Sequence, residues 1–162
     1  MRYRFRAILL GVALTLPGLR HDARAATDAE SLTVKAVVQL SCSLGAATLD
    51  FGTYTAGQTT ELKAQATIGY SSCPATPVKL ELDGGQSKNA AARAMINGTS
   101  KLNYQLYSDS GRTKPLGTGT AALTFTTAAT GTGTVAVYGS IAAGQVVPAG
   151  SYTDTVGILL TF

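Results

Sequence analysis

Apolar and polar residues alternate along several short stretches of the chain, which is the pattern of a β-strand with one buried and one solvated face. In the longest of these stretches, 32–40, one face carries Leu32, Val34, Ala36, Val38 and Leu40. The same period of two marks residues 78–82, 102–107, 123–125, 135–137 and 152–162. Glycine-rich turn signals separate these runs. The pattern predicts an all-β domain built as a sandwich or barrel.

The amino terminus has a different pattern. Three arginines within the first six residues precede an apolar run from Ala7 to Leu19. This order is typical of a secretory signal peptide, and the run is too short to span a bilayer. Ala23-Arg24-Ala25 offers a cleavage site of small residues. We expect residues 1–25 to be a signal peptide and residues 26–162 to form one exported domain, with no membrane span in the mature chain.

The charge of the chain is concentrated in this leader. Its five arginines, less Asp22, account for the whole formal net charge of +4. The mature domain is therefore close to neutral, and we expect no binding to nucleic acid. The only histidine, His21, also lies in the leader. The mature domain thus cannot assemble a Ser-His-Asp or Cys-His catalytic group, and a zinc site built on histidine and cysteine is equally disfavoured.

Other motifs in the mature chain fit a structural role better than a chemical one. Two glycine-rich segments, 117–122 and 131–136, match a loose dinucleotide fingerprint, but neither is expected to open a helix, as that site requires. Glu81 and Asp83 share one face of a predicted strand and are expected to be solvated. Asn97-Gly98-Thr99 matches a glycosylation acceptor, but Asn-Gly is also a hairpin turn. With no nucleophile motif present, we predict a protein that is not an enzyme and binds no cofactor or metal.

Two cysteines, Cys42 and Cys73, remain in the mature domain. A pair of cysteines in an exported protein most simply forms one disulfide. No histidine or basic cluster flanks them that would lower a thiol pKa. We expect the bridge to stabilise the domain by roughly 3 to 4 kcal/mol through the loop that it closes.

The stretch from Leu32 to Leu40 has two interpretations. It can be the first strand of the domain itself. Alternatively, it can add to the open sheet edge of a partner, where main-chain hydrogen bonds supply affinity and side-chain pockets supply register. An unpaired edge otherwise promotes aggregation, so a fold that lacks a strand needs such a partner. The residues alone leave both interpretations open.

A series of short motifs covers nearly all of the mature chain. In order, they are Cys42, Leu49-Asp-Phe-Gly-Thr-Tyr54, Cys73-Pro74, Leu80-Glu-Leu-Asp-Gly-Gly85, Arg93-Ala-Met95, Leu102-Asn-Tyr-Gln-Leu-Tyr107, Val137-Tyr-Gly139, Gly144-Gln145, and Gly150-Ser-Tyr-Thr-Asp-Thr-Val156 with Phe162. This ordered series resembles the spore coat protein U domain family, which includes the pilins of archaic chaperone-usher pili.

The resemblance implies an immunoglobulin-like β-sandwich that lacks its last strand and is completed by donor-strand complementation. It implies a Cys42–Cys73 bridge, and it implies as partners a periplasmic pilus chaperone, an outer-membrane usher, and copies of the chain or related pilins. Unless the subunit donates weakly from a special position in the fibre, the donor strand carries Leu32, Val34, Ala36, Val38 and Leu40. The acceptor groove is expected to include Val156, Ile158, Leu160 and Phe162.

The leading hypothesis is a structural subunit of a surface fibre, an archaic chaperone-usher pilus, that polymerises by donor-strand exchange and supports adhesion or biofilm formation. A single domain of this size resembles a shaft or minor subunit more than a two-domain tip adhesin. One alternative is a spore-coat or extracellular matrix protein of the same fold that forms no fibre. The other is a secreted carbohydrate-binding β-sandwich, because sandwich folds support many functions.

Overall fold

The computed structural model describes residues 30–73 and 75–162, so the predicted signal peptide lies outside the described residues. The chain divides into two units, residues 1–37 and 38–162. The N-terminal segment, defined here as residues 30–41, contains no strand or helix. Its apolar residues Leu32, Val34 and Val38 are 82 to 94% exposed. The prediction of a half-buried strand at 32–40 is therefore wrong for the single chain, because the segment has no partner there.

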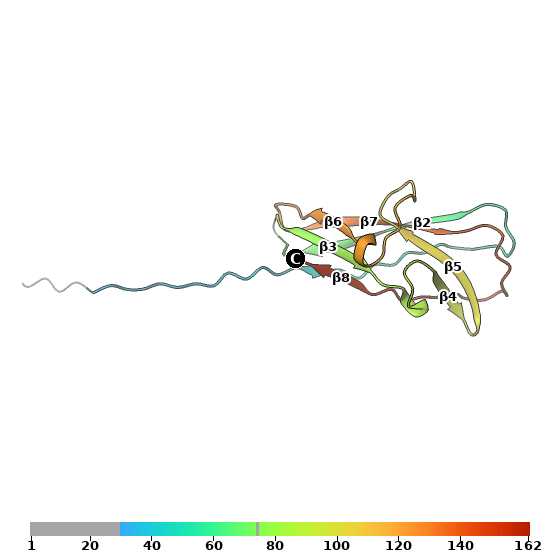
Figure 1. The fold of residues 1–162 in the computed structure, drawn as a ribbon, viewed down its shortest axis with the longest axis horizontal. Coiled ribbons are helices and arrows are strands. Elements are labelled where there is room, and N and C mark those ends of the chain that lie inside the picture. Colours follow the sequence, from blue (N-terminus) through green and yellow to red (C-terminus); the bar gives the residue numbers. More distant parts are fainter. Residues whose placement is uncertain (1–29, 74) are drawn as a thin grey trace, which may run out of the picture. The chain divides into compact units, whose positions relative to one another are not determined.

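Residues 42–162, here called the body, fold into two antiparallel β-sheets arranged as an immunoglobulin-like sandwich (Figure 1), which confirms the predicted fold class. The larger sheet contains, in spatial order, β1 (Ser43–Leu44), β2 (Leu62–Ser71), β7 (Gly133–Ile141), β5 (Ser100–Tyr107) and β4 (Arg93–Asn97). The smaller sheet contains β6 (Leu123–Thr126), β3 (Pro77–Leu82) and β8 (Ile158–Thr161).

Two short 3-10 turns, η1 (Gly85–Ser87) and η2 (Gly119–Ala121), complete the elements. Within the described part of the chain, no helix is long and apolar enough to cross a membrane. The glycine-rich segments at 117–122 and 131–136 lead into β6 and β7, not into α-helices. Asn97 pairs with Ser100 across a tight turn in which Gly98 has a φ of 58°, so a hairpin turn lies here as predicted, with Gly98 and Thr99 as its loop residues.

The core lies between the two sheets. The central strands β2 and β7 pair from Leu62 and Ile141 to Tyr70 and Gly133. In β2, half-buried or buried residues alternate with exposed ones from Leu62 to Ile68. Inward residues from both sheets meet in one hydrophobic cluster, which contains Ile68, Leu80, Leu82, Leu102, Tyr104, Leu106, Leu116, Val137 and Ile141. Burial of this contiguous apolar surface is the main force that holds the sandwich together.

A disulfide joins Cys42 to Cys73 at one end of the body, here called the disulfide end, as predicted. The end of β2 and the end of β8 also lie there, since Ser71 pairs with Ser43 and Thr161 pairs with Lys79 near the start of β3. Turns at 56–61 and 142–150 form the opposite end. Segment 45–55 runs from the disulfide end to the opposite end, and the last segment of the chain, 151–162, returns to the disulfide end (Figure 1).

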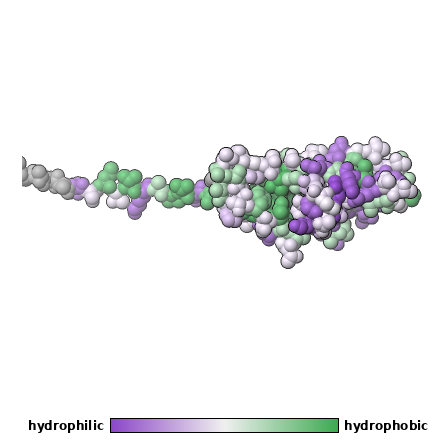
Figure 2. Space-filling model, turned by 90° about the horizontal axis from the view of Figure 1, so that it is seen from above, coloured by the Kyte–Doolittle hydropathy of each residue, from purple (hydrophilic) through white to green (hydrophobic). Residues whose placement is uncertain are grey.

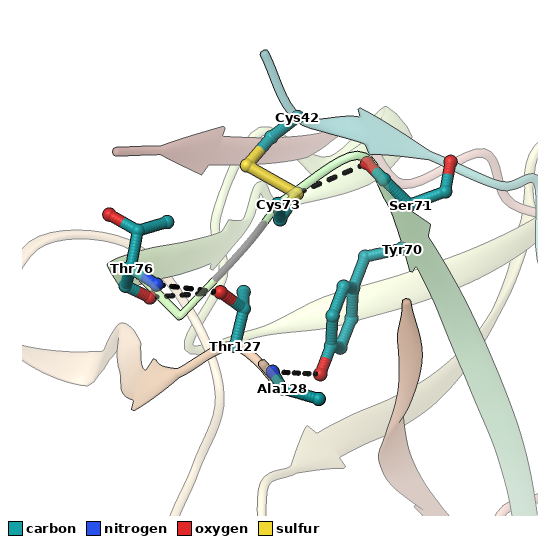
Figure 3. Close-up of a disulfide and its surroundings, with 7 residues drawn as sticks. All are labelled: Cys42, Tyr70, Ser71, Cys73, Thr76, Thr127 and Ala128. Atoms are coloured by element: carbon teal, nitrogen blue, oxygen red, sulfur yellow. Dashed lines mark hydrogen bonds between the residues drawn. A yellow bond between two sulfur atoms is a disulfide. The ribbon is translucent and has the colours of Figure 1, made fainter. Parts of the chain in front are cut away.

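Residues on both sides of Cys73 make hydrogen bonds to residues 127–128 (Figure 3). The hydroxyl of buried Thr127 accepts a hydrogen bond from Thr76 N at 3.0 Å and donates one to Thr76 O at 3.1 Å. The hydroxyl of Tyr70 accepts a hydrogen bond from Ala128 N at 3.1 Å. Cys73 itself is fully buried. The bridge therefore attaches Cys42 to a fixed point of the body.

The predicted strand at 152–162 is regular only in its second half. β8 pairs with β3, but upstream of β8, Thr153 forms an isolated bridge with Ile96 of β4 in the other sheet, at N···O distances of 2.8 and 3.2 Å. The crossing falls at Gly157, whose N–H donates to Asp83 Oδ1 at 2.8 Å. A Cβ at this position would lie only 2.5 Å from that carboxylate. The last segment thus connects both sheets, which alternation alone does not reveal.

A candidate strand-acceptor groove

A groove lies between segment 45–55 and the last segment of the chain. Its central part has a volume of about 310 Å³. One wall carries Leu49 and Phe51, and the other carries Tyr152, Val156 and Ile158. Among the described residues, β8 pairs only with β3, so its second edge has no strand partner. The groove therefore combines an open main-chain edge with an apolar lining.

The floor of the groove is the hydrophobic core. Ile68, Leu82 and Leu106, which come from three different strands, line it while being only 3 to 5% exposed. A second hollow of about 560 Å³ continues from it towards the opposite end, between residues 49–56 and 147–152. The two hollows share lining residues on both walls. Together they form an elongated opening into the sandwich, in the position where one more strand would fit.

The first wall approaches the floor closely at Gly139 of β7. A Cβ built on Gly139 would lie 2.7 Å from Cζ of Phe51 and 3.0 Å from Cδ2 of Leu49. The Phe51 ring also packs edge-on against Tyr104, with 6.0 Å between ring centroids. The absence of a side chain at position 139 thus lets the wall lie against the sheet.

Gly139→Ala is expected to displace this wall and to destabilise the body by about 1 to 3 kcal/mol, the usual cost of overpacking. Gly69→Ala is the matched control, because Gly69 also lies in a central strand but has no atom within 4 Å of an added Cβ. Its effect should stay below about 1 kcal/mol. Urea unfolding curves of the two variants test this, and equal shifts would contradict the close approach.

The far end of the same wall is held by hydrogen bonds. The hydroxyl of Tyr54 donates to Ala142 O at 3.0 Å and accepts from Gln145 N at 2.9 Å. Gly57 N donates to Gln145 O and Gly144 N donates to Gln58 O, both at 2.8 Å. These contacts tie the end of the wall to the 142–150 turn, so the groove is bounded at the opposite end of the body.

One polar pair interrupts the apolar lining. The hydroxyl of buried Tyr104 donates to Asp154 Oδ2 at 2.7 Å, and Asp154 Oδ1 accepts from Gln86 N and Thr155 N at 2.8 Å. Both residues line the groove. Both carboxylate oxygens of Asp154 and the Tyr104 hydroxyl thus have partners, and the described residues that line the groove include no histidine or cysteine. The pair is built to hold the last segment over β5.

Tyr104 should make the body sensitive to alkali. Burial, followed by the hydrogen bond to Asp154, raises the pKa of Tyr104 well above its ordinary value of 10.0. The folded state therefore holds the phenol proton more tightly than the unfolded state does. The resulting stability is fully present below about pH 10 and is lost as the pH rises through the folded pKa. Above about pH 10, the free energy of unfolding measured with urea should fall more steeply with pH for the wild type than for Tyr104→Phe. The same pH dependence for both proteins would contradict this assignment.

Arg93 lies behind the groove and is completely buried. Its Nε donates to Asp83 O at 2.8 Å and its Nη2 donates to Leu82 O at 2.8 Å. Its Nη1 donates to Gln105 Oε1, Leu116 O and Ala90 O at 2.7 to 3.0 Å. Burial lowers the pKa of Arg93, but a guanidinium stays protonated in proteins. Its role is to join the end of β3, the 83–92 loop and β5.

The predicted acceptor residues occupy different places. Val156 and Ile158 line the groove. Leu160 is half-buried against the core. Phe162 is 55% exposed and lines a separate hollow with Lys79 and other residues of β3 and β6. Their role as acceptors stays a prediction. The first wall was not predicted from the sequence, although Leu49 and Phe51 have the two-residue spacing of a strand face.

The two carboxylates singled out in the sequence have structural partners. Glu81 Oε1 accepts from Gly119 N at 2.7 Å and lies 3.0 Å from the Lys79 ammonium group. Asp83 Oδ1 accepts from Gly85 N at 2.8 Å as well as from Gly157 N. In the part of the chain that the structure describes, no three His, Cys, Asp or Glu residues form a group that could hold a metal ion.

The N-terminal segment presents apolar side chains to solvent. Figure 2 shows hydrophobic residues along this segment, and it separately shows a hydrophobic patch on the visible face of the body. Leu40 is 55% exposed, and Val37 is 88% exposed. A soluble domain rarely leaves such a contiguous apolar stretch uncovered without a binding role.

Comparison with known proteins agrees with this architecture. A chain in the crystal structure of the CsuC-CsuE chaperone-tip adhesion subunit pre-assembly complex, from archaic chaperone-usher Csu pili of Acinetobacter baumannii, matches with a TM-score of 0.53 and 24% identity. The match covers 75% of this chain but only 39% of that chain, and it establishes the shared fold. No curated protein matches significantly. The model of the Spore Coat Protein U domain matches residues 28–159, and the chain therefore belongs to that family.

Proposed function

We propose that this chain is a structural subunit of an archaic chaperone-usher pilus, and that its groove accepts the N-terminal segment of another copy as a strand. The observation that carries the proposal is the open apolar groove beside the unpaired edge of β8. Family membership and the fold shared with a chain of a pilus assembly complex support it. The role is structural and requires no catalytic group. The subunit passes through the periplasm after removal of its leader and acts at the cell surface.

The donor and the acceptor have the same length and periodicity. The last segment turns every second residue inward, at positions half-buried beside the groove: Tyr152, Asp154, Val156, Ile158 and Leu160. The N-terminal segment offers five apolar positions with the same spacing: Leu32, Val34, Ala36, Val38 and Leu40. Each series spans roughly 26 Å at about 3.3 Å per residue of extended chain. A strand added here gains main-chain hydrogen bonds along its length and buries its apolar face in the core.

The ends of the body favour one direction of insertion. A donor strand is joined to its own body at Cys42, on the disulfide end. If it entered antiparallel to the last segment, Leu40 would lie near Tyr152, and the donor body would follow beyond the opposite end of the acceptor. The acceptor's own segment would then leave freely from its disulfide end. This head-to-tail contact repeats without closing, as a fibre requires.

An empty groove is a hazard before assembly. Its walls leave apolar residues only half-buried, and such residues beside an unpaired edge promote aggregation. A periplasmic chaperone that temporarily fills the groove would prevent this, and an outer-membrane usher would exchange it for the next donor segment. The name of the matched crystal structure describes such a chaperone-subunit pre-assembly complex for its own proteins.

The test is to export the full chain to the periplasm with and without its cognate chaperone, and to determine mass by size-exclusion chromatography with light scattering. We expect a one-to-one complex that converts to ladders of heat-sensitive oligomers. A fluorescent peptide of residues 28–41 should displace the chaperone and remain bound. A chaperone-independent monomer that does not bind the peptide would overturn the proposal and favour the non-fibrous alternatives.

A further inference from the structure

We propose that the Cys42–Cys73 bridge directs the N-terminal segment into a second copy of the chain, because it prevents the segment from filling the groove of its own body. This inference rests on the proposed strand exchange. It adds a reason why exchange takes place between copies and not within one.

The barrier is needed because self-insertion would otherwise be favoured. A segment joined to its own groove by a short flexible connection has an effective concentration in the millimolar range, on the order of a thousandfold above a micromolar partner. A neighbouring copy could not compete with such a segment. The connection in this chain must therefore be unable to make the required turn.

The connection between the segment and the body is very short. Only Ser41 and Cys42 separate Leu40 from β1. To enter its own groove, the segment would have to reverse here and lie as a hairpin beside segment 45–55, which forms the first wall. Two-residue hairpin turns use residues with positive φ, usually Gly, Asn or Asp. Neither Ser41 nor Cys42 is of that type, and neither has a positive φ in the structure.

Release of β1 would lengthen the connection, and the bridge prevents it. The pairing of β1 with β2 consists of Ser43 with Ser71 and Leu44 with Tyr70, followed by one hydrogen bond from Gly45 N. This pairing is short enough to separate. Without the bridge, residues 41–46 could then form a loop that includes Gly45 and is long enough to turn.

The bridge attaches the connection to a buried residue of the body. The Cα atoms of Cys42 and Cys73 are 4.7 Å apart. Cys73 is completely buried, and its N–H donates to Gly131 O at 3.0 Å. Thr76 makes two hydrogen bonds with Thr127 nearby (Figure 3). Because the bridge keeps Cys42 beside Cys73, a turn into the chain's own groove would have to form within Ser41 and Cys42.

The decisive variant lengthens the connection and leaves the bridge and the body unchanged. A Gly/Ser insert of about six residues between Ser41 and Cys42 provides the turn that the chain lacks. We expect this variant to become a chaperone-independent monomer that no longer polymerises. Its apparent affinity for the labelled 28–41 peptide should fall on the order of a hundredfold, because its own segment competes at high effective concentration. The double variant Cys42→Ser with Cys73→Ser should likewise polymerise less and bind the peptide more weakly than the wild type.

The matched control combines the same insert with Val34→Asp and Val38→Asp. Because these substitutions prevent the chain's own segment from competing, this variant should bind the peptide again. If the insert alone polymerises and binds peptide like the wild type, the inference is overturned, even if the serine variant does not fold. The wild-type body carrying Val34→Asp and Val38→Asp serves to check the proposed function. If the chain with Val34→Asp and Val38→Asp does not bind the peptide, both the proposed function and the role of the bridge are overturned. If it binds the peptide but the insert has no effect, only the role of the bridge is overturned.

Discussion

Val38→Asp is expected to abolish polymerisation, whereas Val37→Asp should leave it intact. The two valines are neighbours and are 94% and 88% exposed in the single chain, so neither change disturbs the body. In an extended strand they point to opposite faces. Only Val38 belongs to the face that would enter the groove, where a carboxylate would be buried without a partner and close to Asp154. A cost of about 3 kcal/mol weakens binding on the order of a hundredfold.

The comparison is made with two labelled 28–41 peptides, each carrying one substitution, and with the corresponding full chains. Fluorescence anisotropy gives the peptide affinities, and unheated gel electrophoresis shows the oligomer ladders. Because both substitutions add the same charge to the same segment, a general effect of charge would lower the affinity of both peptides equally. Equal losses would therefore disprove the proposed face, and a greater loss for Val37→Asp would place the opposite face in the groove.

Arg93→Leu is expected to be among the most destabilising single substitutions in the body, at about 3 to 5 kcal/mol. Its guanidinium reaches four main-chain carbonyl oxygens and the Gln105 side chain, and the hydrogen bonds to Leu82 O and Leu116 O are fully buried. Leucine fills part of the volume but leaves these acceptors without donors. Since a whole domain is stable by only about 5 to 15 kcal/mol, the variant should be largely unfolded without a donor strand. Urea unfolding with and without bound 28–41 peptide measures the loss.

Arg112→Leu is the control for this prediction. Arg112 also donates to main-chain carbonyls, those of Gly139, Ala64 and Ser110, at 3.0 to 3.1 Å. It is only half-buried, so water can replace its hydrogen bonds, and the loss should be about 1 kcal/mol. Similar losses for the two variants would show that Arg93 contributes through its volume and not through its buried hydrogen bonds.

The fold could be predicted from the sequence where alternation involves strongly apolar residues. Strands β3, β5, β6 and β7 lie where the alternation predicts them. β2, the long central strand, was missed because two of its inward positions are Ala64 and Ala66, and alanine carries little strand signal. β4 was missed because it begins with Arg93, a charged residue whose burial depends on carbonyl groups distant in sequence.

The groove could be predicted only in part. Val156 and Ile158 follow from the alternation at the end of the chain, but the Thr153 bridge to β4 and the crossing at Gly157 depend on tertiary contacts. At Leu32–Leu40 the alternation shows only that the segment suits a strand. It does not say whether the pairing edge belongs to the same chain, and the described structure contains no such partner for it.

The short pairing of β1 also has a mechanical consequence. In a fibre joined by inserted segments, tension would enter each body at residue 41, just before the two residues of β1. Pulled alone, that strand could oppose the load with only a few hydrogen bonds to β2. The disulfide passes the load to the end of β2 instead. There the long ladder with β7, from Leu62 to Tyr70, is strained in shear, with many hydrogen bonds resisting at once. The body of such a subunit should therefore resist tension through this ladder and not through β1 alone.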